Sequence, residues 1–438
     1  MIFAFQLLLS LSILIILHEG GHFIPAKFFK TRVEKFYLFF DPYFSLLKKK
    51  IGETEYGIGW LPLGGYVKIS GMVDESMDKE QMALPPQPYE FRSKPAWQRL
   101  IIMIGGVVVN IIVGVVIYGM ILWSYGKQVI PVEHATYGVH CNPIMYQYGF
   151  MDGDKILELD GVRPESFTDI NKRLILDDPH EVTVERFGEI KKITLPENFG
   201  QLMVDSGIKS GAFSLRIPFV IDSVLAGKNA EVAGLLKGDS ITGVNGFYSR
   251  YFQEIARELR ANKNHIVRMH VIRNGETLAV PVMVSADGKI GVDPVSIDHY
   301  LDVDTVRYSF AQAIPGGMHE AWETVTDYSS QLRFLFSKSG ASQVGGFVTF
   351  AKLFPDEWDW WAFWERTAFI SLVLAFMNIL PIPALDGGHV MFLIWELITG
   401  KAVSQKVLER SQIVGMILLL GLMLYGNGMD IFRLVAGS

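Results

Sequence analysis

Residues 100–126 read LIIMIGGVVVNIIVGVVIYGMILWSYG and contain no Asp, Glu, Lys or Arg. An α-helix needs about 20 apolar residues to cross the hydrocarbon core of a bilayer, so this stretch is long enough for a transmembrane helix. Three more stretches also lack charged side chains, namely 1–17, 367–385 and 411–429. The sequence therefore predicts a polytopic α-helical membrane protein with four transmembrane helices, which excludes an ordinary cytosolic enzyme.

The expected membrane halves are 1–126 and 367–438. Charged residues are distributed unevenly between the connecting segment within the first half, 27–99, and the insert that separates the two halves, 127–366. Residues 27–99 contain 12 Lys/Arg and 9 Asp/Glu, whereas residues 127–366 contain 24 and 32. Because basic residues beside membrane helices mark the cytoplasmic side, we expect 27–99 in the cytoplasm and 127–366 outside. We expect the first stretch to be retained, since it lacks a basic n-region and a cleavage site. The net charge of −6 gives no indication of nucleic-acid binding.

The first uncharged stretch runs directly into His18-Glu19-Gly20-Gly21-His22. A spacing of four residues places both imidazoles on one helical face, where they can share a Zn²⁺ ion. Glu19 lies between them and can act as general base on a water molecule. The alternative is a pair of interfacial histidines at a helix end. We favour the metal site, because ionisable side chains at membrane depth are costly and usually functional.

A catalytic zinc ion needs a third protein ligand, for which the sequence offers two candidates. Asp386 ends the third stretch, and His389 follows three residues later. We rank Asp386 first, because an acid at that depth needs a partner. Asn378 can donate a hydrogen bond to a substrate carbonyl or a developing oxyanion. Pro381 and Pro383 break the helix and free backbone groups, so we expect both beside a bound substrate.

Residues 55–68 have no helical period and are rich in glycine and aromatic residues. They predict two short strands with a Gly-rich turn, that is, a β-hairpin. Since the peptide bonds of a substrate helix are locked in hydrogen bonds, the substrate must unwind before attack, and a strand edge can receive the unwound segment. The alternative is a plain cytoplasmic hairpin. The glycines expected to bind substrate are Gly57, Gly59, Gly64 and Gly65.

The large insert contains a repeat, because residues 149–161 and 234–246 align with a constant offset of 85. Both copies contain Gly-x-x-x-Gly-Asp-x-Ile followed by Asp-Gly or Asn-Gly, which resembles the core of a PDZ domain. This predicts two tandem PDZ-like α/β domains at 127–215 and 216–298, between the second and third helices. The pair can capture a substrate's new chain end by strand addition, act as a size filter, or be purely structural.

Residues 299–366 resemble neither module, and we expect a helical linker and an interfacial segment there. A helix is predicted at 311–336, with a break at Pro315-Gly316-Gly317. The single cysteine, Cys141, rules out an intrachain disulfide and is expected to be a packing residue. Four tryptophans form an aromatic belt expected at the outer interface: Trp358, Trp360, Trp361 and Trp364.

The paired motifs resemble the site-2 protease family of intramembrane zinc metalloproteases. The resemblance rests on His-Glu-x-x-His at 18–22, Pro-Leu-Gly-Gly-Tyr-Val at 62–67 and Asn-x-x-Pro-x-Pro-x-Leu-Asp-Gly-Gly at 378–388. The layout of two spans, an insert and two spans resembles that of the bacterial regulator of sigma-E proteases. Three segments depart from the family pattern without removing a candidate ligand or base: Phe39-Phe40-Asp41-Pro42, Gly106-Val107-Val108-Val109-Asn110 and Val344-Gly345-Gly346.

The resemblance implies one Zn²⁺ per chain held by His18, His22 and Asp386, with Glu19 activating water and Asn378 helping to hold the substrate. It implies a membrane-associated β-hairpin at 55–68, and cleavage in or near a transmembrane segment after a first cut outside the membrane by another protease. Expected substrates are single-pass membrane proteins, such as anti-sigma factors, or signal-peptide remnants. The expected location is the bacterial cytoplasmic (inner) membrane, with the insert on the periplasmic side and the active site toward the cytoplasm.

The alternative function is a membrane-anchored tandem-PDZ peptide receptor with a non-catalytic zinc site. The protease and the receptor differ in whether Glu19 matters. A transporter with a broken helix at the bilayer midplane is disfavoured, because the two membrane halves carry unlike motifs.

Overall fold

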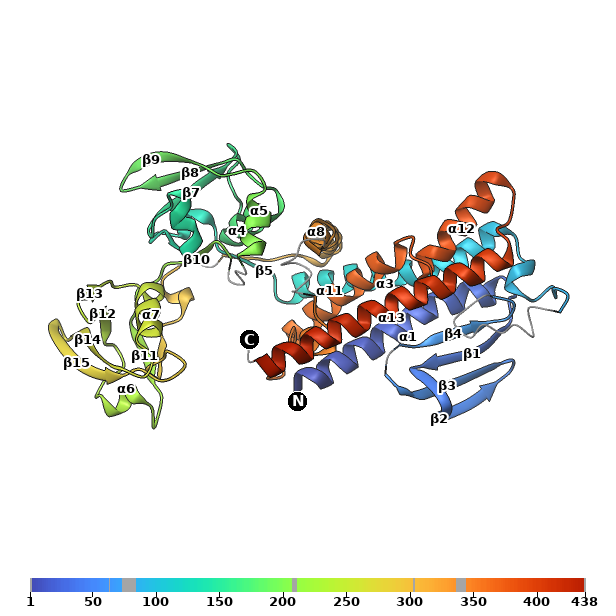
Figure 1. Cartoon of the computed structure of the whole chain (residues 1–438), viewed down its shortest axis with the longest axis horizontal. Coiled ribbons are helices and arrows are strands. Elements are labelled where there is room, and N and C mark those ends of the chain that lie inside the picture. Colours follow the sequence, from blue (N-terminus) through green and yellow to red (C-terminus); the bar gives the residue numbers. More distant parts are fainter. Residues whose placement is uncertain are drawn as a thin grey trace. The chain divides into compact units, whose positions relative to one another are not determined.

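The computed structural model describes residues 2–62, 64–72, 84–206, 211–301, 304–335 and 344–436. The chain divides into two compact units (Figure 1). One unit contains Met1–Gly126 and the described residues from Arg307 onward, and the other contains Lys127–Val306. The first unit is mainly helical, whereas the second is built from short strands and helices.

Four helices of the first unit are long and apolar enough to cross a membrane, as the sequence predicts. Further helices lie between these four along the chain. The membrane helices are α1 (Ile2–Phe28), α3 (Ala96–Ser124), α11 (Trp360–Ile379) and α13 (Gln405–Ala436), and the others are η1 (Phe91–Ser93), α8 (Phe310–Leu335), α10 (Phe347–Ala351) and α12 (Asp386–Thr399).

Glycines allow α1 and α3 to approach each other closely. A Cβ atom built on Gly21 would lie 2.7 Å from the carbonyl carbon of Gly105 and 2.8 Å from the Cα of Gly106. A Cβ on Gly105 would in turn overlap the carbonyl oxygen of Gly21. Close backbone approach at small residues is how membrane helices gain packing contacts without a hydrophobic driving force between them. Gly21 of α1 and the pair Gly105-Gly106 of α3 therefore set the distance between the first two spans.

The predicted break at Pro315-Gly316-Gly317 is wrong, because α8 is continuous through Pro315. The glycines serve packing instead of termination. A Cβ on Gly317 would overlap the backbone of α3 at Val115 and Gly119. The close crossing with α3 thus compensates for the backbone hydrogen bond that a proline inside a helix removes.

The last span, α13, is held at its C-terminal end by a buried carboxylate. Asp430 is 4% exposed and accepts hydrogen bonds from the backbone N–H groups of Gly346, Val348 and Thr349 at 3.0–3.1 Å. These are the free donors at the start of α10. The Arg433 guanidinium donates to the Val344 carbonyl at 3.0 Å. The polar end of α13 is therefore anchored to the segment that precedes α11.

Between α1 and α3 lies a four-stranded sheet, and not the hairpin predicted at 55–68. Its order is β2-β3-β1-β4, in which β3 and β4 both flank β1 and do not pair with each other. The antiparallel hairpin is formed by β2 and β3 instead. The prediction failed because it paired the strands on either side of the Gly64-Gly65 turn, whereas each of them pairs with β1. The strands are β1 (Val33–Leu38), β2 (Phe40–Ile51), β3 (Thr54–Leu61) and β4 (Tyr66–Ile69).

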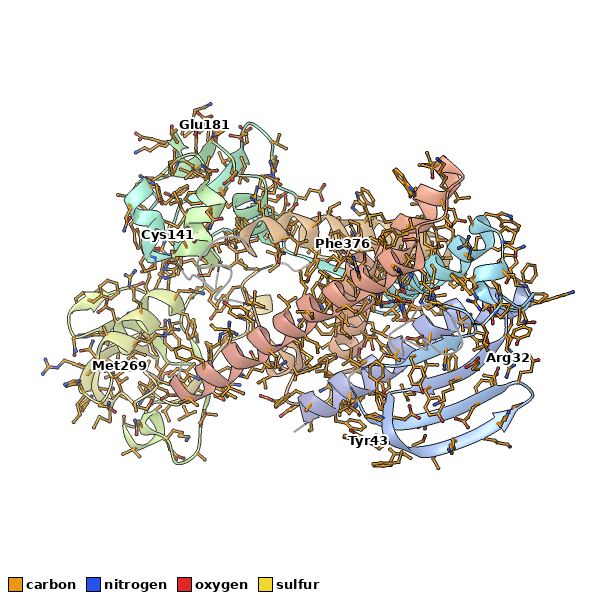
Figure 2. All side chains as sticks on the ribbon, turned by 45° about the vertical axis from the view of Figure 1, so that its right-hand side comes forward. Arg32, Tyr43, Cys141, Glu181, Met269 and Phe376 are labelled. Carbon is orange, nitrogen blue, oxygen red and sulfur yellow. The ribbon has the colours of Figure 1, made fainter. Side chains whose placement is uncertain are left out.

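The edge strand β2 exposes apolar side chains. Tyr43 is fully exposed at the margin of the sheet (Figure 2). Contiguous exposed apolar residues are unusual on a surface that faces only water and indicate contact with lipid or protein. The exposed apolar residues of this strand are Tyr43, Phe44, Leu46, Leu47 and Ile51.

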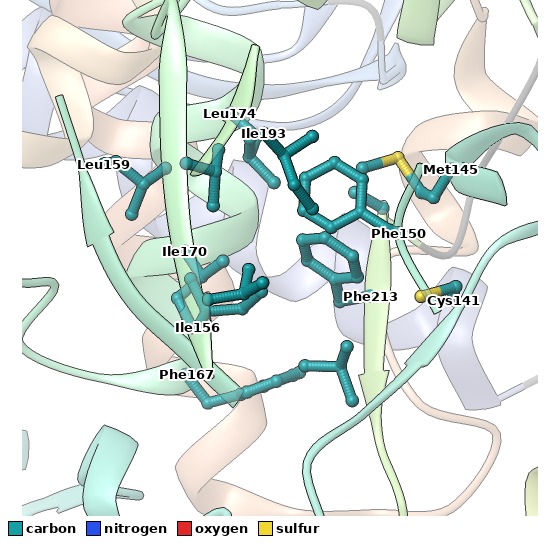
Figure 3. Close-up of a cluster of buried hydrophobic side chains, with 14 of the residues drawn as sticks. Cys141, Met145, Phe150, Ile156, Leu159, Phe167, Ile170, Leu174, Ile193 and Phe213 are labelled. Carbon is teal, nitrogen blue, oxygen red and sulfur yellow. The ribbon is translucent and has the colours of Figure 1, made fainter. Parts of the chain in front are cut away.

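The second unit begins with a module whose core contains Phe150 and Phe213, with ring centroids 5.1 Å apart (Figure 3). Cys141 is fully buried in the same core. Its strands and helices are β5 (Lys127–Val129), η2 (Val132–His134), β6 (Val139–Cys141), η3 (Pro143–Tyr148), β7 (Lys155–Leu159), α4 (Phe167–Leu176), β8 (Glu181–Arg186), β9 (Glu189–Thr194), α5 (Phe199–Asp205) and β10 (Phe213–Leu215).

A second module with its own buried core follows. Its central strand and its main helix, β12 and α7, lie 85 residues after β7 and α4, the offset seen in the sequence. Its elements are β11 (Ile221–Val224), α6 (Asn229–Val232), β12 (Ser240–Val244), β13 (Phe247–Tyr248), α7 (Phe252–Ala261), β14 (Ile266–Arg273), β15 (Glu276–Met283) and β16 (Val292–Pro294).

The two modules share a buried ion pair at equivalent positions. Asp154, which is 1% exposed, binds the guanidinium of Arg186 through two hydrogen bonds of 2.7 Å. Asp239, also 1% exposed, binds Arg273 in the same way at 2.7 and 2.6 Å. Each arginine also donates to the carbonyl of the first glycine of its repeat, Gly149 or Gly234. The repeat seen in the amino-acid sequence is therefore also present in the three-dimensional structure.

After the second module the chain returns to the first one. Leu301 is 3% exposed within the core of the first module, and it follows η4 (Ile297–His299). The strand β17 (Asp304–Val306) then pairs antiparallel with β5. The entry and exit of the insert are thus joined as neighbouring strands.

Candidate metal centre

Three side chains that can bind a metal ion converge within the first unit, which contains the four membrane helices and is called the membrane unit below. His18 and His22 lie one turn apart on α1, and Asp386 is the first residue of α12. The Oδ2 atom of Asp386 lies 3.3 Å from the Nε2 atom of each histidine. The two Nε2 atoms are also 3.3 Å apart. The three atoms therefore form an equilateral triangle.

The dimensions of this triangle suit zinc. Ligand atoms about 2.0–2.1 Å from a tetrahedral Zn²⁺ lie about 3.3–3.4 Å from one another. The Oδ2 atom of Asp386 is buried and has no hydrogen-bond partner, although it faces both imidazoles, so the three atoms point to a common centre. Two imidazole nitrogens, one carboxylate oxygen and an open fourth position form the ligand set expected of a catalytic zinc ion.

The second nitrogen of each histidine faces α3. The Nδ1 atom of His22 lies 2.8 Å from the carbonyl oxygen of Ile102, which can only accept a hydrogen bond. His22 therefore carries its proton on Nδ1 and leaves Nε2 free for a metal ion. The Nδ1 atom of His18 lies 3.2 Å from the side-chain amide of Asn110. Neither contact is visible from sequence spacing, because α3 lies about 80 to 90 residues further along the chain.

Glu19 and the three metal-binding side chains line one cavity of about 650 Å³. Val67, in β4, lines the same cavity as Glu19. Gly65 approaches from the same side, since a Cβ on it would lie 3.6 Å from the Glu19 side chain. Gly65 and the start of β4 therefore lie beside the carboxylate that the sequence predicts as general base.

The remaining residues predicted near the third stretch are placed differently. The Nδ2 atom of Asn378 lies 3.5 Å from Nε2 of His18, beside the three metal-binding atoms. His389 lines the cavity but is not among the three converging groups. Pro381 and Pro383 lie between α11 and α12, where the helix is interrupted as expected. Neither proline lines the cavity, so their contact with a substrate stays a prediction.

Of the four glycines predicted to bind substrate, only Gly65 lines the cavity. Gly57 and Gly59 make room within the sheet, because a Cβ on either would overlap Tyr37 or the backbone at Phe40. Gly64 has a positive φ of 153° and faces the Phe40 ring. A substrate role for these three residues is thus untested, whereas their packing role is visible.

Several cavity residues were not singled out from the sequence. Tyr66 donates to Asp41 at 2.7 Å, and the Lys35 ammonium lies 3.8 Å from the same carboxylate. Gln412 and Met416 reach the cavity from α13. Asp41 belongs to the Phe39–Pro42 departure from the family pattern, which was the only sequence signal for this group.

A second cluster of metal-ligating side chains lies in the insert, where His140, Asp152 and Glu254 come together. Its carboxylates already have partners. Glu254 binds the Arg216 guanidinium at 2.6 Å, and Asp152 accepts hydrogen bonds from the Cys141 backbone and the Tyr146 hydroxyl. The cluster is therefore accounted for as an ionic contact between the two modules.

Comparison with known proteins agrees with the geometry of the centre. The sequence model of peptidase family M50 matches residues 6–422. The regulator of sigma-E protease RseP of Escherichia coli is 27% identical over 444 residues, covering 96% of this chain and 97% of that protein. The protease RseP of Yersinia pestis is 26% identical and covers 96% and 97%, and the regulator of sigma E protease of Haemophilus influenzae is 26% identical and covers 98% of both. The chain belongs to peptidase family M50, the site-2 protease family, and is a zinc metalloprotease.

Proposed function

We propose that this protease hydrolyses a peptide bond in or near the transmembrane segment of a membrane-protein substrate. The observation that carries the proposal is the convergence of His18, His22 and Asp386 beside Glu19 in one cavity of the membrane unit. The metal-binding atoms come from two helices and Glu19 from one of them, so the site exists only where these helices pack together. A hydrolytic site at this place can reach a peptide bond that water in bulk solution cannot.

His18, His22 and Asp386 would hold the zinc ion, which when bound supplies a Lewis acid that polarises the scissile carbonyl and acidifies water. The Glu19 carboxylate takes the proton of the attacking water and passes it to the leaving amide nitrogen. Asn378, which lies 3.5 Å from His18, donates its amide N–H to the oxygen that develops negative charge.

We propose that β4 receives the unwound substrate. It is an edge strand of the sheet, and Gly65, Tyr66 and Val67 line the cavity beside Glu19. Backbone groups on a free strand edge can replace the hydrogen bonds that a substrate helix loses on unwinding. This arrangement supports the interpretation of the 55–68 segment as a substrate-binding element, although its strands pair differently from the prediction.

We propose that the two modules of the insert are PDZ-like domains that gate or capture the substrate. Their duplicated strands, helix and Asp–Arg ion pair support a tandem origin. With the Lys/Arg asymmetry of the sequence, the insert would lie on the periplasmic side of the inner membrane, and the zinc site toward the cytoplasmic side. A substrate of the anti-sigma type, first cut outside by another protease, fits the names of the relatives from E. coli and H. influenzae, which are both regulators of sigma E.

The test is the substitution Glu19→Gln in the full-length protein. Glu19 is not a ligand in this assignment, so the variant should keep one equivalent of zinc and lose cleavage of a transmembrane substrate. Glu189→Gln, at an exposed strand position, is the matched control and should cleave normally. Normal cleavage by Glu19→Gln would refute the role of Glu19 as general base, whereas a wild-type protein that cleaves no transmembrane substrate would favour the peptide receptor with a non-catalytic zinc site. Comparing membrane proteomes of the wild type and Glu19→Gln should reveal the natural substrates as accumulated transmembrane fragments.

A further inference from the structure

Asn110 is the buried polar residue of α3 that faces the metal centre. It is 0% exposed, and it lies one helical turn after Gly106 on the same face of the helix. A Cβ on Gly106 would lie 2.6–2.8 Å from the His18 ring and would overlap Nε2 of His22. Gly106 therefore lets the helix backbone approach the imidazoles, and Asn110 presents an amide to them.

The orientation of the Asn110 amide does not match the protonation that His18 needs as a metal ligand. The amide nitrogen of Asn110 faces Nδ1 of His18 at 3.2 Å, while the amide oxygen is buried without a hydrogen-bond partner. In this orientation the amide donates to Nδ1, so the single proton of a neutral imidazole must sit on Nε2. A protonated Nε2 cannot bind a metal ion, yet Nε2 is the atom that points at Asp386 and His22.

Turning the amide of Asn110 over resolves the mismatch. The oxygen then accepts the Nδ1–H of His18, and Nε2 keeps a free lone pair. The turn forfeits no hydrogen bond, since the oxygen has none to lose. The two ends of an asparagine amide have almost the same shape, so the surrounding packing permits either orientation.

We propose that Asn110 is a positioning residue for the metal ligand His18, whose Nδ1–H it accepts so that Nε2 is free to bind the ion. The inference rests on the ligand set of the proposed function. His22 is oriented in the same manner by the Ile102 carbonyl, two turns earlier on the same helix. The helix α3 thus orients both ligand histidines, and the Ser371 hydroxyl of α11 binds the Asn110 carbonyl at 2.8 Å and fixes this turn.

The test is the metal affinity of purified full-length protein, measured by chelator competition with Zn²⁺ and with Co²⁺. Loss of an outer partner of a ligand histidine typically weakens metal binding about 10- to 100-fold, which is the effect expected for Asn110→Ala. Asn110→Asp keeps an acceptor at the same place and should bind within about three-fold of the wild type, or more tightly. The visible absorption of bound Co²⁺ should change in Asn110→Ala and be restored in Asn110→Asp.

Ser371→Ala separates orientation from packing, because it removes a buried hydrogen bond to the same turn but leaves the Asn110 side chain. Its metal affinity should stay near that of the wild type. The inference is overturned if Asn110→Ala binds as tightly as the wild type, if Asn110→Asp is as weak as Asn110→Ala, or if Ser371→Ala is equally weak. Metal affinity needs no substrate, so normal cleavage by Glu19→Gln would overturn the proposed catalysis and leave this inference standing.

Discussion

Replacing Gly21 by alanine should separate α1 from α3 and weaken zinc binding. The added Cβ would meet only backbone atoms, at 2.7 Å from the Gly105 carbonyl carbon and 2.8 Å from the Gly106 Cα, and would overlap the Gly105 oxygen. Ordinary van der Waals contact begins at 3.4 Å. Backbone atoms inside a helix cannot rotate away as a side chain does, so the two helices must move apart.

The size of the effect follows from these distances. The helices must separate locally by at least about 0.7 Å, from 2.7 to 3.4 Å, to restore contact at the carbonyl carbon. Metal–ligand distances tolerate about 0.2 Å, and His22 is the next residue. Overpacking of this kind costs about 1–3 kcal/mol of folding free energy. We therefore expect both a lower unfolding temperature and a loss of zinc affinity.

Gly20→Ala is the matched control, because it changes the other central residue of the same motif. A Cβ on Gly20 meets nothing within 4 Å, and alanine is favoured over glycine in a helix by up to about 1 kcal/mol. The assay is thermal unfolding of both variants in detergent, together with zinc content after dialysis. If Gly21→Ala keeps its zinc and unfolds at the wild-type temperature, the inferred contact between α1 and α3 is wrong.

Three further predictions concern the ligand set and the insert. Asp386→Ala should lower the zinc content of the purified protein well below one equivalent while His389→Ala leaves it unchanged, and the reverse result would refute the choice of third ligand. Burial raises the pKa of the Cys141 thiol, so N-ethylmaleimide should label the native protein only on unfolding, and rapid native labelling would contradict the described core. Burial opposes ionisation of Asp239, yet hydrogen bonds from Arg273 and the Leu236 N–H hold its pKa below the usual value. Stability from this carboxylate is therefore present above its ordinary pKa of about 3.9 and lost as the pH falls further, so amide hydrogen exchange in β12–β15 should accelerate in acid for the wild type and change less with pH in Asp239→Asn.

Much of the architecture could be predicted from local patterns. The uncharged stretches predicted the four membrane helices, because the length of an apolar run must match the bilayer whatever the neighbouring helices are. The spacing of His18 and His22 placed their rings on one face, because four residues make about one turn. The 85-residue offset indicated two copies of one structural unit, and β7 and β12 lie at this offset from each other.

Other features depended on partners that no local pattern encodes. The strands β3 and β4 each pair with β1 and not with each other, since strand pairing is decided by the whole sheet. Pro315 does not break α8, because close packing on α3 outweighs the lost hydrogen bond. The sequence of the last span, α13, did not indicate what its C-terminal end does. The hydrogen bonds from the start of α10 to Asp430 explain why this end carries a buried carboxylate.

The sequence by itself therefore determined which residues share a helical face and which segments can enter a membrane, because both follow from periodicity and length. The tertiary structure decided which faces meet. It brought Asp386 to two histidines more than 360 residues away, and it distinguished Gly20, which touches nothing, from Gly21, which α3 crosses. It also placed Asn110 against His18. Contacts between distant segments arise only when whole helices pack, so the spacing of residues along one helix cannot reveal them.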